Sequence, residues 1–194
     1  MVVLQEAPRL LWWRTSRRRL ARAAGLRLVT HARAGGNAVL VAPDVEVLQT
    51  YATVFPKRPG LHRRATAGAV VRLAGRSLAV AGSHLDLDGP ARVDSARRVR
   101  NAAPPLPLVL GADVNEPPGG AAWTLLAAGL VDAGSAPTFP ARQPSRRLDA
   151  LFVDPALRVV AHEVPATSAS DHRPVVVDLV WAAPQGVVPP SLRM

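Results

Sequence analysis

Short apolar runs recur along almost the whole chain, and glycine, proline or aspartate separates each run from the next. Runs of about 4–8 residues between such breakers are typical of β-strands. We therefore predict strands at residues 2–5, 26–30, 37–42, 45–49, 69–73, 78–83, 106–110, 148–153, 158–164 and 174–181. Gly75 lies between two of these runs, which favours a hairpin over residues 72–78.

Three other segments carry helix signals. Residues 15–24 begin with two hydroxyl side chains and end before Gly25. Residues 89–101 carry arginines at helical spacing, and residues 118–128 end before Gly129. About ten strands against three helices predict an α/β fold, a two-layer β-sandwich flanked by helices.

The length of 194 residues fits one domain, which we place at residues 1–183, followed by a proline-rich tail at 184–194 that we expect to be flexible. The chain has no cysteine, which excludes disulfides, thiolate metal sites and cysteine nucleophiles. No apolar run reaches the ~18 residues of a membrane-spanning helix, and no signal-peptide pattern opens the chain. We therefore expect a monomeric cytoplasmic protein.

The chain is basic, with 24 lysine and arginine residues against 14 acidic ones and a net charge of +10. Such a balance favours a polyanionic partner, DNA or RNA first. The candidate contacts to a phosphate backbone are Arg17, Arg18, Arg19, Arg22, Arg63 and Arg64. The alternative is a solvated basic face, because Lys57 is the only lysine and isoleucine is absent, a skew typical of GC-rich coding.

Small polar clusters lie at the ends of five predicted strands or within them, where an apolar core has no use for them. They are Gln5 and Glu6; Ser83 and His84; Asp113 and Asn115; Asp149; and Ser170, Asp171 and His172. Most have a plainer interpretation as helix-entry, surface, turn or capping residues. Asp149 does not, because an unpartnered carboxylate within an apolar strand costs several kcal/mol or stays protonated.

Together these groups have the composition of a site for metal-assisted phosphoryl chemistry. A hard cation such as Mg²⁺, with Mn²⁺ as the alternative, takes oxygen ligands and keeps several waters, so one or two carboxylates suffice. Imidazoles balance phosphate charge or move protons, and a carboxylate behind one of them fixes its tautomer.

The order of these motifs resembles the endonuclease/exonuclease/phosphatase superfamily, which includes deoxyribonuclease I-like and exonuclease III-like enzymes. The matching stretches are Gln-Glu at 5–6, Ser-His-Leu at 83–85, Gly-Ala-Asp-Val-Asn at 111–115, Arg-Leu-Asp-Ala-Leu-Phe-Val at 147–153 and Ser-Asp-His-Arg-Pro-Val at 170–175. The resemblance spans nearly the whole chain, from residue 2 to about residue 181, and implies the deoxyribonuclease I-like fold.

The resemblance also implies roles for individual residues. Glu6 would be the principal metal ligand, with Asp171 on the metal side. Asp113 would activate or orient the attacking water, and Asn115 would position it. His84 would contact a phosphate oxygen.

His172 would stabilise the transition state, oriented by Asp149 through its other ring nitrogen. We also expect Asn37 and Arg173 near the substrate, Asn37 mainly in a structural role.

One element of the family pattern is missing from the sequence. The family's first strand normally precedes the Gln-Glu motif and carries an asparagine that supports the metal, whereas only residues 1–5 precede Glu6 here. We therefore expect an unpaired apolar strand edge in one sheet. The strand lies upstream of Met1, or the metal is held by fewer groups, or activity has been lost.

The sequence thus predicts a metal-dependent phosphoesterase that hydrolyses phosphodiester or phosphomonoester bonds by in-line attack of water, with nucleic acid as the favoured substrate. The alternatives are a phosphodiesterase for a phosphorylated lipid or inositol head group, and a catalytically impaired basic module that binds nucleic acid.

Overall fold

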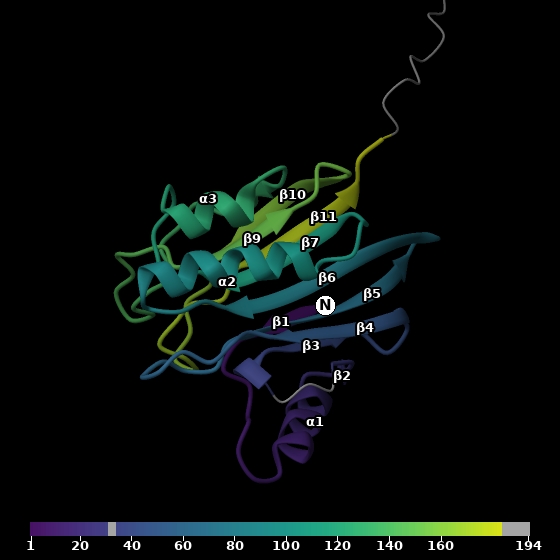
Figure 1. The fold of residues 1–194 in the computed structure, drawn as a ribbon. Helices are drawn as coiled ribbons and strands as arrows, with labels where there is room; N and C mark the ends of the chain where they lie inside the picture. Colours follow the sequence, from purple (N-terminus) through teal and green to yellow (C-terminus); the bar gives the residue numbers. More distant parts are fainter. Residues whose placement is uncertain (31–33, 184–194) are drawn as a thin grey trace, which may run out of the picture.

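The computed structural model describes residues 1–30 and 34–183 and contains, within them, three α-helices, a short 3-10 helix and eleven β-strands (Figure 1). The helices are α1 (Trp13–Ala23), η1 (Ala34–Gly36), α2 (Gly89–Ala102) and α3 (Ala121–Ala127). The strands are β1 (Val2–Leu4), β2 (Arg27–Leu28), β3 (Ala38–Val41), β4 (Glu46–Val54), β5 (Ala65–Leu73), β6 (Arg76–His84), β7 (Leu108–Asp113), β8 (Val131–Asp132), β9 (Asp149–Val153), β10 (Leu157–Glu163) and β11 (Val176–Trp181). None of the helices in the described part of the chain has both the length and the apolar character needed to cross a bilayer.

A six-stranded sheet forms the centre of the molecule, in the order β4-β5-β6-β7-β9-β8. Side chains alternate between its two faces, as the pleat of a strand requires. In β6, Ala79 and Ala81 pack with the residues of α2 and α3, whereas Leu78 and Val80 pack toward the other strands. The central sheet therefore carries an apolar core on each face, with α2 and α3 covering one of them (Figure 1).

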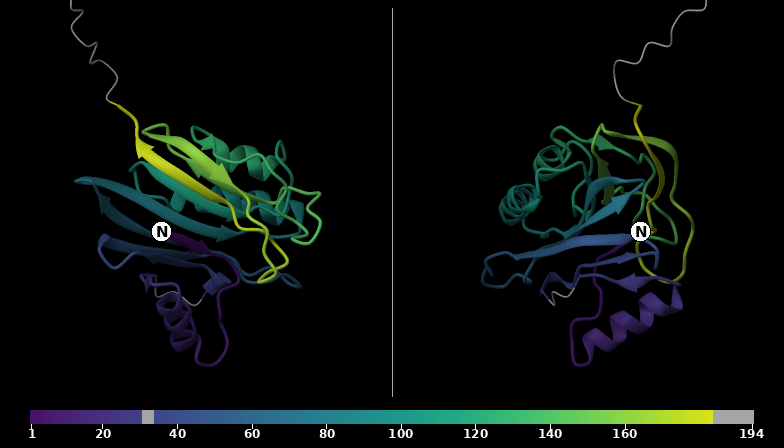
Figure 2. Two further views of the ribbon diagram at one scale, coloured as in Figure 1. Left: turned by 180° about the vertical axis from the view of Figure 1, so that it is seen from behind. Right: turned by 90° about the vertical axis from the view of Figure 1, so that its right-hand side faces the viewer.

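The second layer of strands is in two pieces. One is a three-stranded sheet, β1-β3-β2, with α1 on its outer side, and the other is the pair β10-β11 (Figure 2). A cleft of about 1000 Å³ lies between β1 and β11. Its walls are these two strands, and the apolar side chains Leu78, Val80 and Val109 of the central sheet also line it. Both β1 and β11 are end strands of their sheets, so the expected unpaired edge is present.

The predicted α/β sandwich with three helices is confirmed, as is the hairpin, where Ala74 and Gly75 adopt the left-handed backbone of a tight turn between β5 and β6. Several predicted limits were wrong. The strand predicted at 69–73 begins at Ala65, because its first residues are small or polar yet buried and give no apolar signal. The strand at 106–110 runs on to Asp113, and the two-residue strand β8 was not predicted.

The predicted start of the first helix was also wrong. It begins at Trp13, after Trp12 in a left-handed backbone conformation and without a side-chain cap, so Thr15 does not cap it. The predicted stop signals hold, since Gly25 and Gly129 both have positive φ. The predicted tail at 184–194 lies outside the described residues.

Strand β1 approaches the central sheet at a point where two glycines leave room for it. A β-carbon at Gly82 would lie 2.2 Å from Val3 Cγ1, and one at Gly111 would lie 3.4 Å from the same atom. The absence of side chains at Gly82 in β6 and Gly111 in β7 therefore allows β1, and the loop that follows it, to lie close to the ends of these strands.

We predict that Gly82→Ala destabilises the protein by about 1–3 kcal/mol, because the added methyl group overpacks a site with no free space. Denaturant unfolding measures the change. Gly89→Ala is the matched control, because a β-carbon there has its nearest neighbour at 3.9 Å and φ is not positive. Equal stability of the two variants would contradict the close approach of β1.

Candidate active site

The register of the central sheet sets three of the predicted site residues in a row. In the parallel pair β6-β7, His84 is the partner of Asp113, and in the antiparallel pair β7-β9, Asp113 is the partner of Asp149. Paired residues point to the same face of a sheet. Counting by twos along each strand, this is the face of Val80 and Val109, which packs toward the second layer.

Two loops of the second layer complete the group. Glu6 follows β1, and its Oε1 lies 3.8 Å from His84 Nδ1, while His84 Nε2 lies 3.2 Å from Asp113 Oδ2. The His84 ring thus stands between two carboxylates. His172 precedes β11 and its Nδ1 is 2.8 Å from Asp149 Oδ2. The structure therefore brings these five residues to one end of the sandwich.

The loop that carries Glu6 is held in place by a buried arginine of α1. Arg17 is 1% exposed, and its guanidinium donates to the carbonyl oxygens of Pro8 at 2.8 Å and of Asn37 at 3.2 Å. The Ala7 amide also donates to the Gly36 carbonyl at 2.7 Å. Arg17 was interpreted above as a surface contact for nucleic acid, and its burial shows that this interpretation was wrong.

His84 is uncharged at neutral pH. Burial and, after it, the nearby positive charge of Arg64 lower its pKa to about 3. Its Nδ1 has no hydrogen-bond partner within the described residues. The ring is 7% exposed, so the alternative of an ordinary surface histidine does not hold.

Asp113 and Asp149 form a crowded acidic pair. Burial and, after it, the negative charge of Asp149 raise the pKa of Asp113 to about 7, with partial relief from His172. The hydrogen bond to Asp149 raises the pKa of His172 above its ordinary value, against the effect of burial. Asp149 itself has the partner that a carboxylate in an apolar strand needs.

Two asparagines from the prediction are held in place by hydrogen bonds, and one of them contacts this group. The Asn115 amide N–H donates to Asp113 Oδ1 at 3.0 Å, and its side chain donates to the Leu85 carbonyl at 3.0 Å. Asn115 has φ 55°, a left-handed backbone conformation that asparagine adopts more readily than most residues. Asn37 is fully buried and donates to the Ala65 carbonyl at 2.7 Å, while its Oδ1 lacks a partner within the described residues.

The remaining two predicted residues are less closely tied to the group. Asp171 is exposed, and its carboxylate lies 3.5 Å from the Ser170 hydroxyl while adding to the negative field at His172. The Arg173 side chain donates to the Ala141 carbonyl at 2.7 Å, which orders the loop before β11. The structure gives both residues local partners and does not bring them into contact with Asp113.

The carboxylates fit a hard divalent cation. Asp113, Asp149 and His172 offer ligand atoms that lie within 4.8 Å of one another. Glu6 adds a carboxylate that is 76% exposed and therefore open to an ion. The oxygen-rich donor set is the one that Mg²⁺ or Mn²⁺ prefers.

Sequence reasoning missed two residues that set the position of His172 and Asp149. The Phe139 ring packs on the His172 ring with centroids 4.7 Å apart. The Thr138 hydroxyl accepts from the backbone N–H groups of Leu148 and Asp149 at 3.2 and 3.3 Å. The segment around them has no strand or helix signal, and no pattern in the chain marks it.

Comparison with known proteins agrees with this geometry. The sequence model described as the Endonuclease/Exonuclease/phosphatase family matches residues 1–172. No curated protein matches the chain. The solved structure of a Bacteroides vulgatus endonuclease/exonuclease/phosphatase has a TM-score of 0.76 and 21% identity, covering 93% of this chain and 84% of that one.

Two further solved structures are similar. A mannosyl-6-phosphatase of Bacteroides thetaiotaomicron VPI-5482 has a TM-score of 0.72 and 19% identity, covering 81% of this chain and 78% of that one. D. rerio TDP2 complexed with single-strand DNA product has a TM-score of 0.74 and 18% identity, covering 92% and 85%. At these identities the likeness shows a shared fold.

We predict that the metal-free protein loses stability as the pH rises from about 4 to about 7 because of Asp113. Its pKa of about 7 in the folded state lies above the value of 3.8 that applies to the unfolded chain. The folded state therefore holds the extra proton, and its contribution is complete below pH 3.8 and lost as the pH passes about 7. The slope approaches about 1.4 kcal/mol per pH unit.

Urea unfolding of the wild type and Asp113→Asn in EDTA, at several pH values, measures this difference. The variant should lack this component of the pH dependence, and Mg²⁺ should restore wild-type stability near pH 7. Identical pH profiles for the two proteins would show that Asp113 is not in the crowded, buried environment described above.

Proposed function

Because this chain belongs to the endonuclease/exonuclease/phosphatase family, we propose that it is a divalent-metal-dependent phosphoesterase whose reaction takes place at the row of His84, Asp113 and Asp149. The observation that carries the proposal is the convergence of Glu6 and His172, from opposite parts of the chain, on that row. The bond broken is a phosphodiester or a phosphomonoester, by in-line attack of water. Hydrolysis of phosphoester bonds is the activity of this family.

Asp113 is suited to take a proton from the attacking water. Its pKa of about 7 matches the pH of the cell, which is the condition for an efficient general base. The Asn115 amide N–H fixes one carboxylate oxygen at 3.0 Å, so the other is directed toward the substrate. His84 lies beside that second oxygen and, being neutral, offers a hydrogen bond without adding positive charge.

His172 is suited to donate to the phosphate. Its Nδ1 is committed to Asp149 at 2.8 Å, which leaves Nε2 for a phosphate oxygen. The raised pKa keeps the ring protonated to higher pH than a free histidine, so it can stabilise negative charge as it develops. The packed ring of Phe139 holds this orientation.

Glu6, with Asp171 on the metal side, would hold a Mg²⁺ or Mn²⁺ ion, and that ion would supply Lewis-acid stabilisation of the phosphoryl oxygens. The protein residues do the remaining work of orienting water, holding the phosphate and moving protons.

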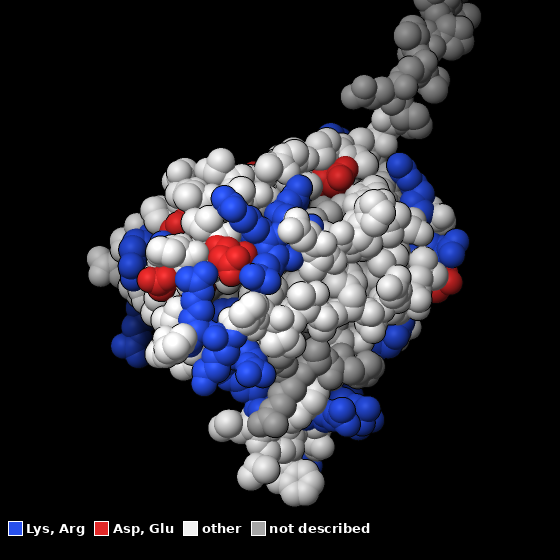
Figure 3. All heavy atoms as spheres, viewed as in Figure 1, with Lys and Arg blue, Asp and Glu red and all other residues white. Residues whose placement is uncertain are grey.

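Nucleic acid is the substrate that the surface charge favours. The net charge is +10, and phosphate neutralisation supplies most of the sequence-independent affinity for nucleic acids. Figure 3 shows basic side chains gathered across α2 and toward the lower edge of that face, with some acidic side chains among them. The similar TDP2 structure holds single-strand DNA product. A phosphorylated lipid or inositol head group is the alternative substrate. Competition between nucleic acid and such a head group for the site distinguishes the two substrate classes.

We predict hydrolysis of bis-p-nitrophenyl phosphate by the purified chain with Mg²⁺ or Mn²⁺ and none in EDTA. Asp113→Ala should lower kcat by at least about 100-fold, as expected for loss of a general base. Asp44→Ala is the control, because Asp44 is exposed. If the folded protein is inert with both metals but binds DNA with a steep salt dependence, it is a binding module and the enzyme proposal is wrong.

Asp149→Asn tests the role of His172. We expect kcat to fall by more than the affinity for Mg²⁺, because the partner of Asp149 is His172. The pKa of His172 falls when the charged partner is lost, so the high-pH limb of the rate profile should move to lower pH. An equal loss of turnover and metal affinity, with no movement of that limb, would assign Asp149 to the metal instead.

A further inference from the structure

A buried arginine lies beside the site and is not used by the chemistry described above. Arg64 immediately precedes β5, at the same end of the central sheet as His84. Its side chain is 8% exposed. The Arg64 carbonyl accepts from the Phe55 amide at 2.9 Å, which anchors the backbone of this segment to the end of β4. Sheet pairing therefore sets the position of the Arg64 backbone, from which the side chain extends.

The guanidinium has too few partners for its burial. Within the part of the chain that the structure describes, Nε has no hydrogen-bond partner, and the ion pair to Asp86 Oδ2 spans 3.9 Å. A buried donor without a partner is destabilising, and more so when it is charged. Burial lowers the pKa of Arg64, while the charges of Asp86, Asp113 and Glu6 oppose the effect. Arg64 is thus held within the field of the site without contacting its acids.

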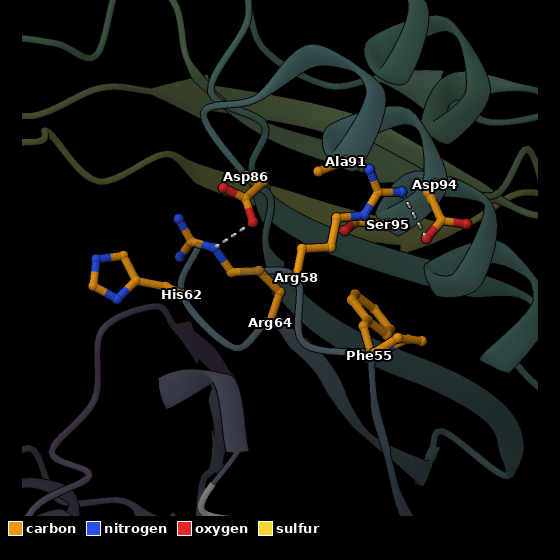
Figure 4. A pocket seen from close by; sticks show the side chains of 9 residues that line it. Phe55, Arg58, His62, Arg64, Asp86, Ala91, Asp94 and Ser95 are labelled. Carbon is orange, nitrogen blue, oxygen red and sulfur yellow. Dashed lines mark ion pairs between the residues drawn. The ribbon is translucent and has the colours of Figure 1, made fainter. Parts of the chain in front are cut away.

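A small hollow lies next to this guanidinium. Its lining includes Arg58, His62, Asp86 and the first turn of α2 at Ala91, and none of the five converging site residues. In Figure 4, the guanidinium of Arg64 points away from α2 and toward His62. The hollow has about 10 Å³ of free space, close to the room for one water. It can take a single oxygen atom, but not a sugar or a base.

We propose that Arg64, with His62 and Arg58 at the rim, forms a subsite that binds a second phosphate of the substrate, next to the phosphate that is hydrolysed. The substrate class is then a phosphate ester with a neighbouring phosphate, as in a nucleic acid strand. This inference rests on the function proposed above.

The chemistry of the group favours phosphate. A guanidinium N–H forms a strong, charge-assisted hydrogen bond to a phosphate oxygen, and the hollow has room for one such oxygen. Asp86 and Asp94 also line the hollow, but Asp94 is already paired with Arg98 at 3.0 Å and Arg58 at 3.5 Å. Asp86 holds Arg64 only at 3.9 Å, so a phosphate oxygen can still bind the guanidinium.

Matched chromogenic substrates test the proposal. Thymidine 3′-(4-nitrophenyl phosphate) is compared with the same ester bearing a 5′-phosphate, and the 5′-ester is compared with its 3′-phosphorylated form, so that both strand polarities are covered. Arg64→Gln should raise KM about tenfold or more for one bisphosphorylated member, the loss typical of a charge-assisted hydrogen bond. Its KM for the matched monophosphorylated ester should change by less than about twofold.

The control is Arg72→Gln, at the opposite end of β5, where an exposed arginine pairs with Glu46 at 3.0 Å. It should leave both KM values unchanged. Asp86→Asn separates binding from folding, because it removes the competing carboxylate and keeps Arg64. It should not raise KM for the bisphosphorylated ester. Equal effects of Arg64→Gln on both members of a pair, or none on either, would overturn the subsite.

A binding experiment tests this inference separately from the proposed function. If no ester is hydrolysed, the proposed function fails, and titration calorimetry with thymidine 3′,5′-bisphosphate and with each monophosphate still tests the subsite. The wild type should prefer the bisphosphate, and Arg64→Gln should lose that preference. Equal affinity of the wild type for all three probes would overturn the inference independently of catalysis.

Discussion

The repulsion between two neighbouring carboxylates is the constraint on which the site depends. Sheet register makes Asp113 and Asp149 partners on adjacent strands, pointing to the same face, at a buried end of the sandwich. Two such charges cannot both remain ionised without nearby positive charge. The surrounding groups divide this task. His172 compensates Asp149 directly, whereas Asp113 keeps a raised pKa and is left for a proton or a cation.

The rest of the architecture serves to bring outside groups to that pair. Val3 seats β1 on Gly82 and Gly111, and the loop that follows is tied down by the buried guanidinium of Arg17. This arrangement places Glu6 opposite Asp113, with the His84 ring between them. On the other side, the loop before β11 places His172 beside Asp149. The apolar cleft between β1 and β11 separates the loop that carries Glu6 from the loop that carries His172. Each loop is therefore held in place by its own contacts.

The α/β sandwich with three helices was predicted from the sequence, and so were the polar motifs that the central sheet brings side by side. Strand ends were marked by polar motifs, and the hard-to-bury carboxylate Asp149 indicated a partner, which is His172. The pairing of strands could not be derived, because register depends on contacts distant in the chain. Nor could the direction of the arginines. Arg17 and Arg64 look like surface charge in the sequence, yet both are buried, and only packing against residues from other segments shows it.

The central claim is that these distant segments form one pocket for a divalent cation. Crystals soaked in Mn²⁺ and measured at the manganese absorption edge test it directly. The account predicts an anomalous peak within the pocket bounded by Glu6, Asp113, Asp149 and His172, absent from crystals of Asp113→Ala. Ordered manganese only elsewhere on the molecule, such as beside Asp86 and Asp94, would contradict it, as would no bound manganese at saturating concentration.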